Sequence, residues 1–128
     1  MFVGVLRLSL RIAGSRSLKD RRRVVRSFKD RLQARLRVSV AEVGALDDHQ
    51  AAVIGVAVVS NDAVRCDELL AKAAAMASTL RDATLVDCAT EIVPFGREGS
   101  GVRGDDRLLV SLDEDEAVTL EREREDES

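Results

Sequence analysis

Apolar and polar residues alternate from residue 2 to residue 12. A period of two predicts a β-strand whose two faces differ in polarity. One face of this strand consists of Phe2, Gly4, Leu6, Leu8, Leu10 and Ile12. Arg7 and Arg11 lie on the other face, so we expect that face to point away from the hydrophobic core.

The spacing of apolar residues becomes helical after a turn at residues 13–16. Intervals of three, four and seven residues separate Leu18, Val25, Phe28, Leu32 and Leu36. This spacing predicts a helix that begins after Ser17, ends near Leu36 and buries these residues as one stripe. Ser17 and Asp20 have the spacing of a capping box, in which each side chain accepts a hydrogen bond from a backbone N–H group.

Four further elements are expected along the chain. β-branched residues predict a strand at 38–43, and a second strand follows a turn, at 51–59. Residues 51–59 are apolar at both sets of alternating positions, so we expect this strand at the centre of the sheet. A helix at 62–81 would bury Cys66, Leu69, Ala73, Met76 and Leu80. The last strand is expected at 84–93 and ends before Pro94.

The order β-α-β-β-α-β predicts an α+β fold of the ferredoxin-like type. We expect an antiparallel sheet with the strand order 4-1-3-2 and both helices on one face. Residues 1–94 would form this domain. Residues 95–128 are first Gly-rich and then acidic, which predicts a largely flexible tail.

Two helices on one face leave the other face of the sheet open. In the predicted arrangement the open face carries Val3, Val5, Val53, Ala57 and Val59. A monomer rarely leaves such an apolar patch in water. A second copy of the chain or the apolar segment 108–112 would cover it, and we favour a homodimer.

Aromatic residues are scarce, since the 128 residues include three Phe, no Trp, no Tyr and one His. Proteins that bind nucleic acid on a sheet stack bases on aromatic side chains, and many enzymes transfer protons through His or Tyr. The composition therefore argues against base stacking and favours a binding protein over an enzyme. We expect no cofactor. Asp47, Asp48 and His49 could bind a metal weakly, but a plain turn explains them better.

The cysteines and the hydropathy pattern suggest a compartment. Cys66 and Cys88 match neither a metal-binding spacing nor a CxxC motif, so we expect two buried, reduced thiols. No apolar run is long enough to cross a membrane, and the N-terminus lacks the order of a signal peptide. We expect a soluble cytoplasmic protein without a membrane partner.

The net charge of −3 conceals a segregation of charge along the chain. The net charge is +10 over residues 1–37, −6 over residues 38–94 and −7 over residues 95–128. At about 3.6 residues per turn, one exposed side of the first helix carries Lys19, Arg22, Arg23, Arg26 and Arg37. Arg21, Arg31 and Arg35 flank the other edge of its apolar stripe.

A helix this basic predicts contacts to the phosphates of RNA or of a ribosomal subunit. The alternative is a solvated face that the acidic tail partly neutralises. Both ideas combine if the tail competes with RNA for the helix, because a tethered competitor acts at a high effective concentration.

Two other functions stay open. Gly14, Ser15, Arg16 and Ser17 precede a helix N-terminus, where N–H groups can hold an anion, as a small phosphate-handling enzyme would require. A helix cap explains Ser17 better. The protein could also be a small-ligand-sensing or dimerisation module whose dimer interface forms a pocket.

Three stretches of sequence occur together at specific spacings. They are residues 16–22 (RSLKDRR), 39–43 (SVAEV) and 59–62 (VSND), and residues 3–6 (VGVL) fit the same pattern. With these stretches the chain resembles the YlxP-like family of small bacterial proteins, a domain of unknown function, over about residues 1–93. The resemblance implies a ferredoxin-like fold. It also implies work on RNA or the ribosome, because genes of that family often lie beside translation-initiation and ribosome-maturation genes. It implies no catalytic residues.

Overall fold

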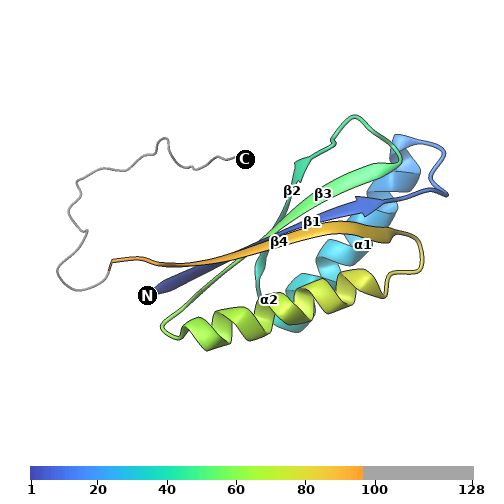
Figure 1. The fold of residues 1–128 in the computed structure, drawn as a ribbon. Helices are drawn as coiled ribbons and strands as arrows, with labels where there is room; N and C mark the ends of the chain where they lie inside the picture. The colour runs from blue at the N-terminus through green and yellow to red at the C-terminus, as the bar shows by residue number, and fades with distance from the viewer. Residues whose placement is uncertain (97–128) are drawn as a thin grey trace. The chain divides into compact units, whose positions relative to one another are not determined.

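The structure is a computed structural model that describes residues 1–96. Its elements are β1 (Phe2–Arg11), α1 (Leu18–Leu36), β2 (Ser39–Gly44), β3 (Ala51–Ser60), α2 (Ala63–Ser78) and β4 (Thr84–Pro94). They confirm the predicted β-α-β-β-α-β order and the ferredoxin-like α+β sandwich (Figure 1). The predicted acidic tail and the segment 108–112 lie outside the described residues.

The sheet has the order β2-β3-β1-β4, which is the predicted order read from the opposite edge. β1 and β3 form its centre and pair antiparallel along their whole length. In this register Leu6 lies opposite Val56 and Leu8 opposite Ile54, and all four side chains are buried. The alternation of β1 therefore separates a core face from an outer face, as the sequence predicts.

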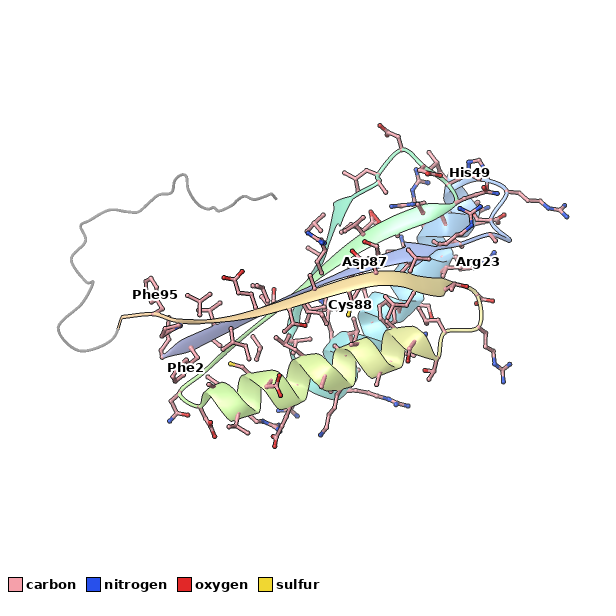
Figure 2. All side chains as sticks on the ribbon, in the orientation of Figure 1. Phe2, Arg23, His49, Asp87, Cys88 and Phe95 are labelled. Atoms are coloured by element: carbon pink, nitrogen blue, oxygen red, sulfur yellow. The ribbon has the colours of Figure 1, made fainter. Side chains whose placement is uncertain are left out.

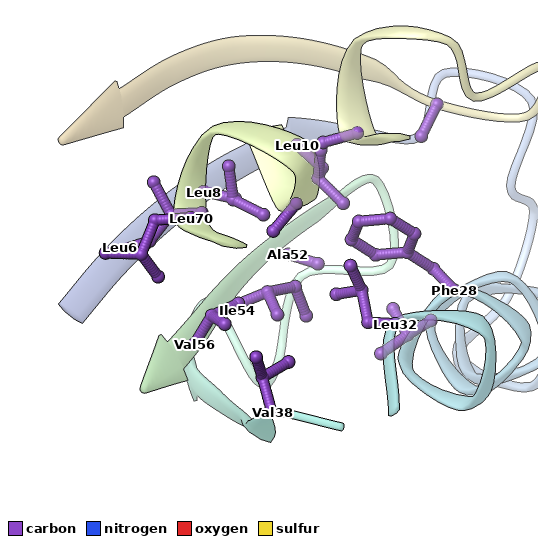
Figure 3. Packing of buried hydrophobic residues seen from close by; sticks show 14 of the residues in the cluster. Leu6, Leu8, Leu10, Phe28, Leu32, Val38, Ala52, Ile54, Val56 and Leu70 are labelled. Carbon is purple, nitrogen blue, oxygen red and sulfur yellow. The ribbon is translucent and has the colours of Figure 1, made fainter. Parts of the chain in front are cut away.

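One hydrophobic core lies between the sheet and both helices (Figure 3). Phe28 and Leu32 of α1 and Leu70 of α2 belong to the same buried cluster as the inward residues of β1 and β3. Both helices therefore cover the same face of the sheet. Phe28 is fully buried, and burial of such a side chain contributes roughly 1.5–3 kcal/mol relative to its exposure.

Gly4 lies where α2 packs closely against β1. A Cβ atom at this position would lie 2.9 Å from Leu70 Cδ1 and 3.2 Å from Cys66 Cβ. Those distances are shorter than normal van der Waals contact, so a side chain at this position would require the Leu70 side chain to move and α2 to shift by a few tenths of an ångström. The glycine at this inward position of β1 sets the close approach of helix and sheet.

The predicted cap of α1 is present with one change. Ser17 is the N-cap, and its Oγ accepts a hydrogen bond from the Asp20 N–H at 3.2 Å. The Asp20 carboxylate reaches one residue further back than in the usual capping box, and accepts from the Arg16 N–H at 3.1 Å. The cap thus uses both side chains that the sequence indicated.

α2 ends at Ser78, before the predicted end at residue 81. The hydroxyls of Ser78 and Thr79 donate to the carbonyls of Ala75 and Met76 at 2.8 and 3.1 Å. These local bonds compete with continuation of the helix. The early end leaves Leu80 only half-buried, whereas the predicted stripe placed it in the core.

The buried stripe of α1 contains a charged residue that the helical spacing predicts at its edge. Val25, Phe28 and Leu32 are buried as predicted, but Leu18 is 38% exposed. Arg21 lies on the stripe instead and is 2% exposed. The prediction that Arg21 flanks the stripe is therefore wrong, because hydrogen-bond acceptors are present to satisfy its guanidinium group inside the protein.

Three acceptors from the β2–β3 hairpin surround this guanidinium group. Arg21 Nη1 donates to Glu42 Oε2 at 3.0 Å, Nε to the Ala51 carbonyl at 2.8 Å and Nη2 to the Ala45 carbonyl at 3.1 Å. Ala45 has φ 58°, a left-handed conformation that costs an L-residue roughly 1–2 kcal/mol. Arg21 therefore fixes the rotation of α1 about its axis and also holds the hairpin turn.

We expect Arg21→Met to lower the free energy of unfolding by about 3 kcal/mol, because the variant leaves Glu42 and two carbonyls without their buried donor. Urea unfolding followed by circular dichroism measures the loss. Arg22→Met is the matched control, and its exposed side chain should change stability by less than about 0.5 kcal/mol. Equal losses in the two variants would contradict the role of Arg21.

Candidate nucleic-acid interface

The first helix presents a series of basic side chains to solvent. Lys19, Arg22, Arg23 and Arg26 are exposed on α1, and Arg37 is exposed at its C-cap, where φ is 55°. The helix has 19 residues and therefore a length of roughly 28 Å. The candidate phosphate contacts are thus spread along one rigid element rather than over mobile loops.

Most of these charges have no acidic partner among the described residues. Arg23 Nη2 lies 3.3 Å from Asp20 Oδ1. Within residues 1–96, no carboxylate lies within 4.0 Å of Lys19, Arg22 or Arg26. Like charges on neighbouring turns of a helix repel each other. A bound polyanion would relieve that repulsion.

An open pocket of about 900 Å³ lies beside α1. Its walls come from residues 11–15 at the end of β1, from the side of α1 between Asp20 and Arg31, and from residues 79–84 between α2 and β4. Figure 2 shows Arg23 at the end of the sheet where β4 begins. The end of β1 and the start of β4 meet here because the two strands are antiparallel neighbours.

The pocket brings only some of the predicted residues together. Gly14 and Ser15 of the candidate anion loop line it, and so does Arg23 of the candidate phosphate contacts. The remaining predicted residues lie outside its lining, namely Arg16, Ser17, Lys19, Arg22, Arg26 and Arg37. The structure therefore separates α1 into a side that borders the pocket and a side that is simply exposed.

Several hydrogen-bond donors of the loop at residues 14–17 already have acceptors within the protein. The Ser15 N–H donates to the Ile12 carbonyl at 3.0 Å, and the Arg16 N–H donates to Asp20. The Ser15 hydroxyl is buried and donates to the Ser17 carbonyl at 2.9 Å. An anion that bound the Arg16 N–H would have to displace the Asp20 carboxylate, and Ser17 Oγ already caps the helix, so the geometry favours a capping role for Ser17.

Three arginines of the pocket were not among the predicted binding residues. They are Arg11, Arg31 and Arg81. Arg31 lies on α1, whereas Arg11 ends β1 and Arg81 precedes β4, so only the sheet topology indicates that Arg11 and Arg81 lie at the same site. Antiparallel neighbours bring such positions to the same end of a sheet, whatever their separation along the chain.

A family comparison covers the same part of the molecule. Residues 3–90 match the model of a family described as a protein of unknown function, DUF503. The chain belongs to the DUF503 family. The matched segment contains all of α1 and every residue that lines the pocket. Both features therefore lie in the DUF503 domain. No curated protein matches the chain.

The outer face of the DUF503 sheet carries exposed apolar side chains. Val5 is 40% exposed and Val59 is 60% exposed. Val59 lies opposite Val3, and Val5 opposite Ala57, on the two central strands. Val43, in the β-bulge of β2, is 58% exposed. This open face agrees with the apolar patch expected from the alternation of the strands.

The two cysteines of the DUF503 domain have different environments. Cys66 lies on the buried side of α2, whereas Cys88 is exposed on β4, and both are free thiols. The prediction of a buried thiol is therefore wrong for Cys88. β4 is an edge strand of the sheet, and nearly all of its side chains are exposed.

The loop with the single histidine is a hydrogen-bonded turn. Asp48 Oδ1 accepts from the Gln50 N–H at 2.8 Å, and the Asp48 N–H donates to the Ala45 carbonyl at 3.2 Å. Within residues 1–96, no three metal-ligating side chains come together. In the same part of the chain, neither helix has the length and hydropathy to span a membrane.

Proposed function

We propose that this protein is a non-enzymatic binding protein for RNA or ribosomal subunits, and that the exposed basic side of α1 contacts phosphates. The observation that carries the proposal is the exposure of Lys19, Arg22 and Arg26 with no carboxylate within 4.0 Å among residues 1–96. Each such group can displace a condensed cation from a phosphate backbone, which makes binding favourable at low salt.

The proposed contacts recognise the charge and shape of the RNA backbone rather than its base sequence. On the two central strands, Phe2 is the one aromatic residue. Phe2 belongs to the inward-facing set of β1 with Gly4 and Leu6, so the outer face of these two strands offers bases no aromatic side chain on which to stack. Arginine and lysine on a straight helix can instead follow a phosphate backbone, so we expect weak dependence on RNA sequence.

We assign the chain to the YlxP-like members of its family, and we place its action in the cytoplasm, without a membrane partner. Residues 16–22 and 59–62 support the assignment. The translation-linked gene neighbourhood that this resemblance implies supports a ribosomal partner.

The acidic tail would modulate this binding. Residues 95–128 carry a net charge of −7, and residues 1–37 carry +10. A segment on the same chain stays close to the helix and therefore competes at a high effective concentration. Free RNA must be abundant to match that concentration. The tail would therefore lower the affinity for RNA without contacting RNA itself.

A second copy of the chain would cover the open face of the sheet. Val5 and Val59 are exposed on that face, and burial of apolar area is the main driving force of association. A sheet-to-sheet homodimer leaves both α1 helices on its outside, because α1 packs on the opposite face of the sheet. Dimer formation and RNA binding are thus compatible.

We expect R22E/R26E to weaken RNA binding at low salt by at least about tenfold, because two phosphate contacts become repulsive. The slope of log affinity against log salt should flatten by about 2. Filter binding of a ribosomal RNA fragment over a series of KCl concentrations measures both quantities. Comigration with ribosomal subunits in a sucrose gradient then separates a ribosomal partner from free RNA.

The matched control is R65E/K72E, which makes the same change of charge on the exposed face of α2. It should retain most of the wild-type affinity. A flat salt dependence of the wild-type chain would contradict the proposal, and so would equal losses in the two double variants. Circular dichroism checks that both variants fold.

We expect deletion of residues 95–128 to tighten RNA binding by about tenfold or more at low salt, because the tethered competitor is removed. The gain should shrink at high salt, where charge interactions are screened. The same filter-binding titration measures it. An unchanged affinity at low salt would show that the tail does not modulate binding.

We expect light scattering of the full chain to give twice the chain mass of 14.0 kDa. Val59→Lys should shift the equilibrium toward the monomer, since it places a charge within the proposed interface. Val64→Lys is the control, because Val64 is 63% exposed but lies on α2. A wild-type monomer, or equal dissociation of both variants, would contradict the sheet-to-sheet dimer.

A further inference from the structure

The pocket beside α1 is not explained by contacts to an RNA backbone. Lys19, Arg22 and Arg26, which carry the RNA proposal, are absent from its lining. The pocket is concave and is built from three separate segments of the chain. A half-open pocket of this construction can hold a ligand of finite size, whereas an extended polymer backbone follows an open surface.

The charge of the pocket is strongly asymmetric. Its basic side chains are Arg11, Arg23, Arg31 and Arg81, and its acidic side chains are Asp20 and Asp82. Asp20 is already engaged, because Oδ1 lies 3.3 Å from Arg23 and Oδ2 accepts from the Arg16 N–H. Asp82 is thus the one pocket carboxylate without an assigned contact among residues 1–96. The pocket therefore offers excess positive charge to a ligand.

Three of these guanidinium groups have their hydrogen-bonding capacity available. Within residues 1–96, no carboxylate lies within 4.0 Å of Arg11, Arg31 or Arg81. None of the three donates a side-chain hydrogen bond to another described residue. A guanidinium group presents five N–H donors in a fixed plane, which matches the oxygens of a phosphoryl group in a bidentate arrangement.

The remaining lining of the pocket is apolar or carries hydroxyl groups. Ile12 and Ala83 are buried below it, and Val24 and Leu80 are half-buried. Hydroxyl-bearing residues also line the pocket, including Ser27. An anionic group alone would leave the apolar part of the site in water. A ligand with both a charged group and a less polar body would fill it.

We infer that this pocket binds a phosphorylated small molecule of about mononucleotide size. The arginines would hold the phosphoryl group, and the apolar residues would contact the rest of the ligand. The cavity volume of about 900 Å³ lies in the range of roughly 300–1,000 Å³ that is typical of small-ligand pockets. This inference stands apart from the RNA proposal, because Lys19, Arg22 and Arg26 lie outside the pocket and Arg23 is the one residue that both proposals use.

The test is calorimetric titration of the full chain with four probes, namely AMP, adenosine, inorganic phosphate and malate. We expect AMP to bind one site per chain. Inorganic phosphate should bind at least about tenfold more weakly, since it lacks a body that contacts the apolar residues. Adenosine and malate should not bind measurably at millimolar concentration, because one lacks the phosphoryl group and the other replaces it by carboxylates.

R31Q/R81Q should weaken AMP binding by about 100-fold, since each glutamine removes a charged donor. R22Q/R26Q is the matched control and should bind AMP as the wild type does. The inference is overturned if AMP does not bind, if R31Q/R81Q binds it normally, or if adenosine, phosphate or malate binds as tightly. Circular dichroism of the variants excludes unfolding as the cause of a loss.

The same variants separate this inference from the proposed function. R31Q/R81Q should lose AMP and keep most of its RNA affinity, whereas R22Q/R26Q should lose RNA affinity and keep AMP. If R31Q/R81Q lost both AMP and RNA binding while R22Q/R26Q lost neither, the pocket would be part of an RNA site. That result would overturn an independent small-molecule site.

Discussion

The geometry of the basic surface depends on one buried guanidinium group. Arg21 bonds to Glu42 and to the carbonyls of Ala45 and Ala51, so it fixes the rotation of α1 relative to the β2–β3 hairpin. An apolar side chain in this place could pack in several ways, but planar donors need acceptors in fixed directions. With this rotation, Phe28 points into the core and basic residues emerge on both sides of the buried stripe.

The two sides of α1 offer different chemistry because their surroundings differ. Arg23 and Arg31 border a concave site that β1 and the segment before β4 complete. Arg22 and Arg26 lie outside that site and face solvent. A concave cluster can discriminate between small anions by size and shape, whereas an exposed row of charges holds a polyanion with little selectivity. One helix would thus serve both proposed kinds of anion recognition.

The patterns that predicted the fold are local ones. The alternation in β1 and the cap at Ser17 could be read from neighbouring residues, and both are present. Burial of Arg21 could not be predicted in this way, because Glu42 lies 21 residues further along the chain. The exposure of Cys88 likewise depends on β4 being an edge strand. The pocket was missed because Arg11 and Arg81 meet only through the sheet topology.

The shortage of aromatic residues limits what the outer face of the sheet could bind. Without stacking platforms the outer sheet face has little to offer a nucleic acid, so its exposed valines are better suited to a second copy of the chain. In such a dimer two sheets would lie about 10 Å apart, and a helix layer of about 10 Å covers each. The two α1 helices would then be roughly 30 Å apart, several times the Debye length of about 8 Å in physiological salt. Each helix would therefore act on its own phosphates, and the dimer would gain affinity by joining two sites rather than by adding their electric fields.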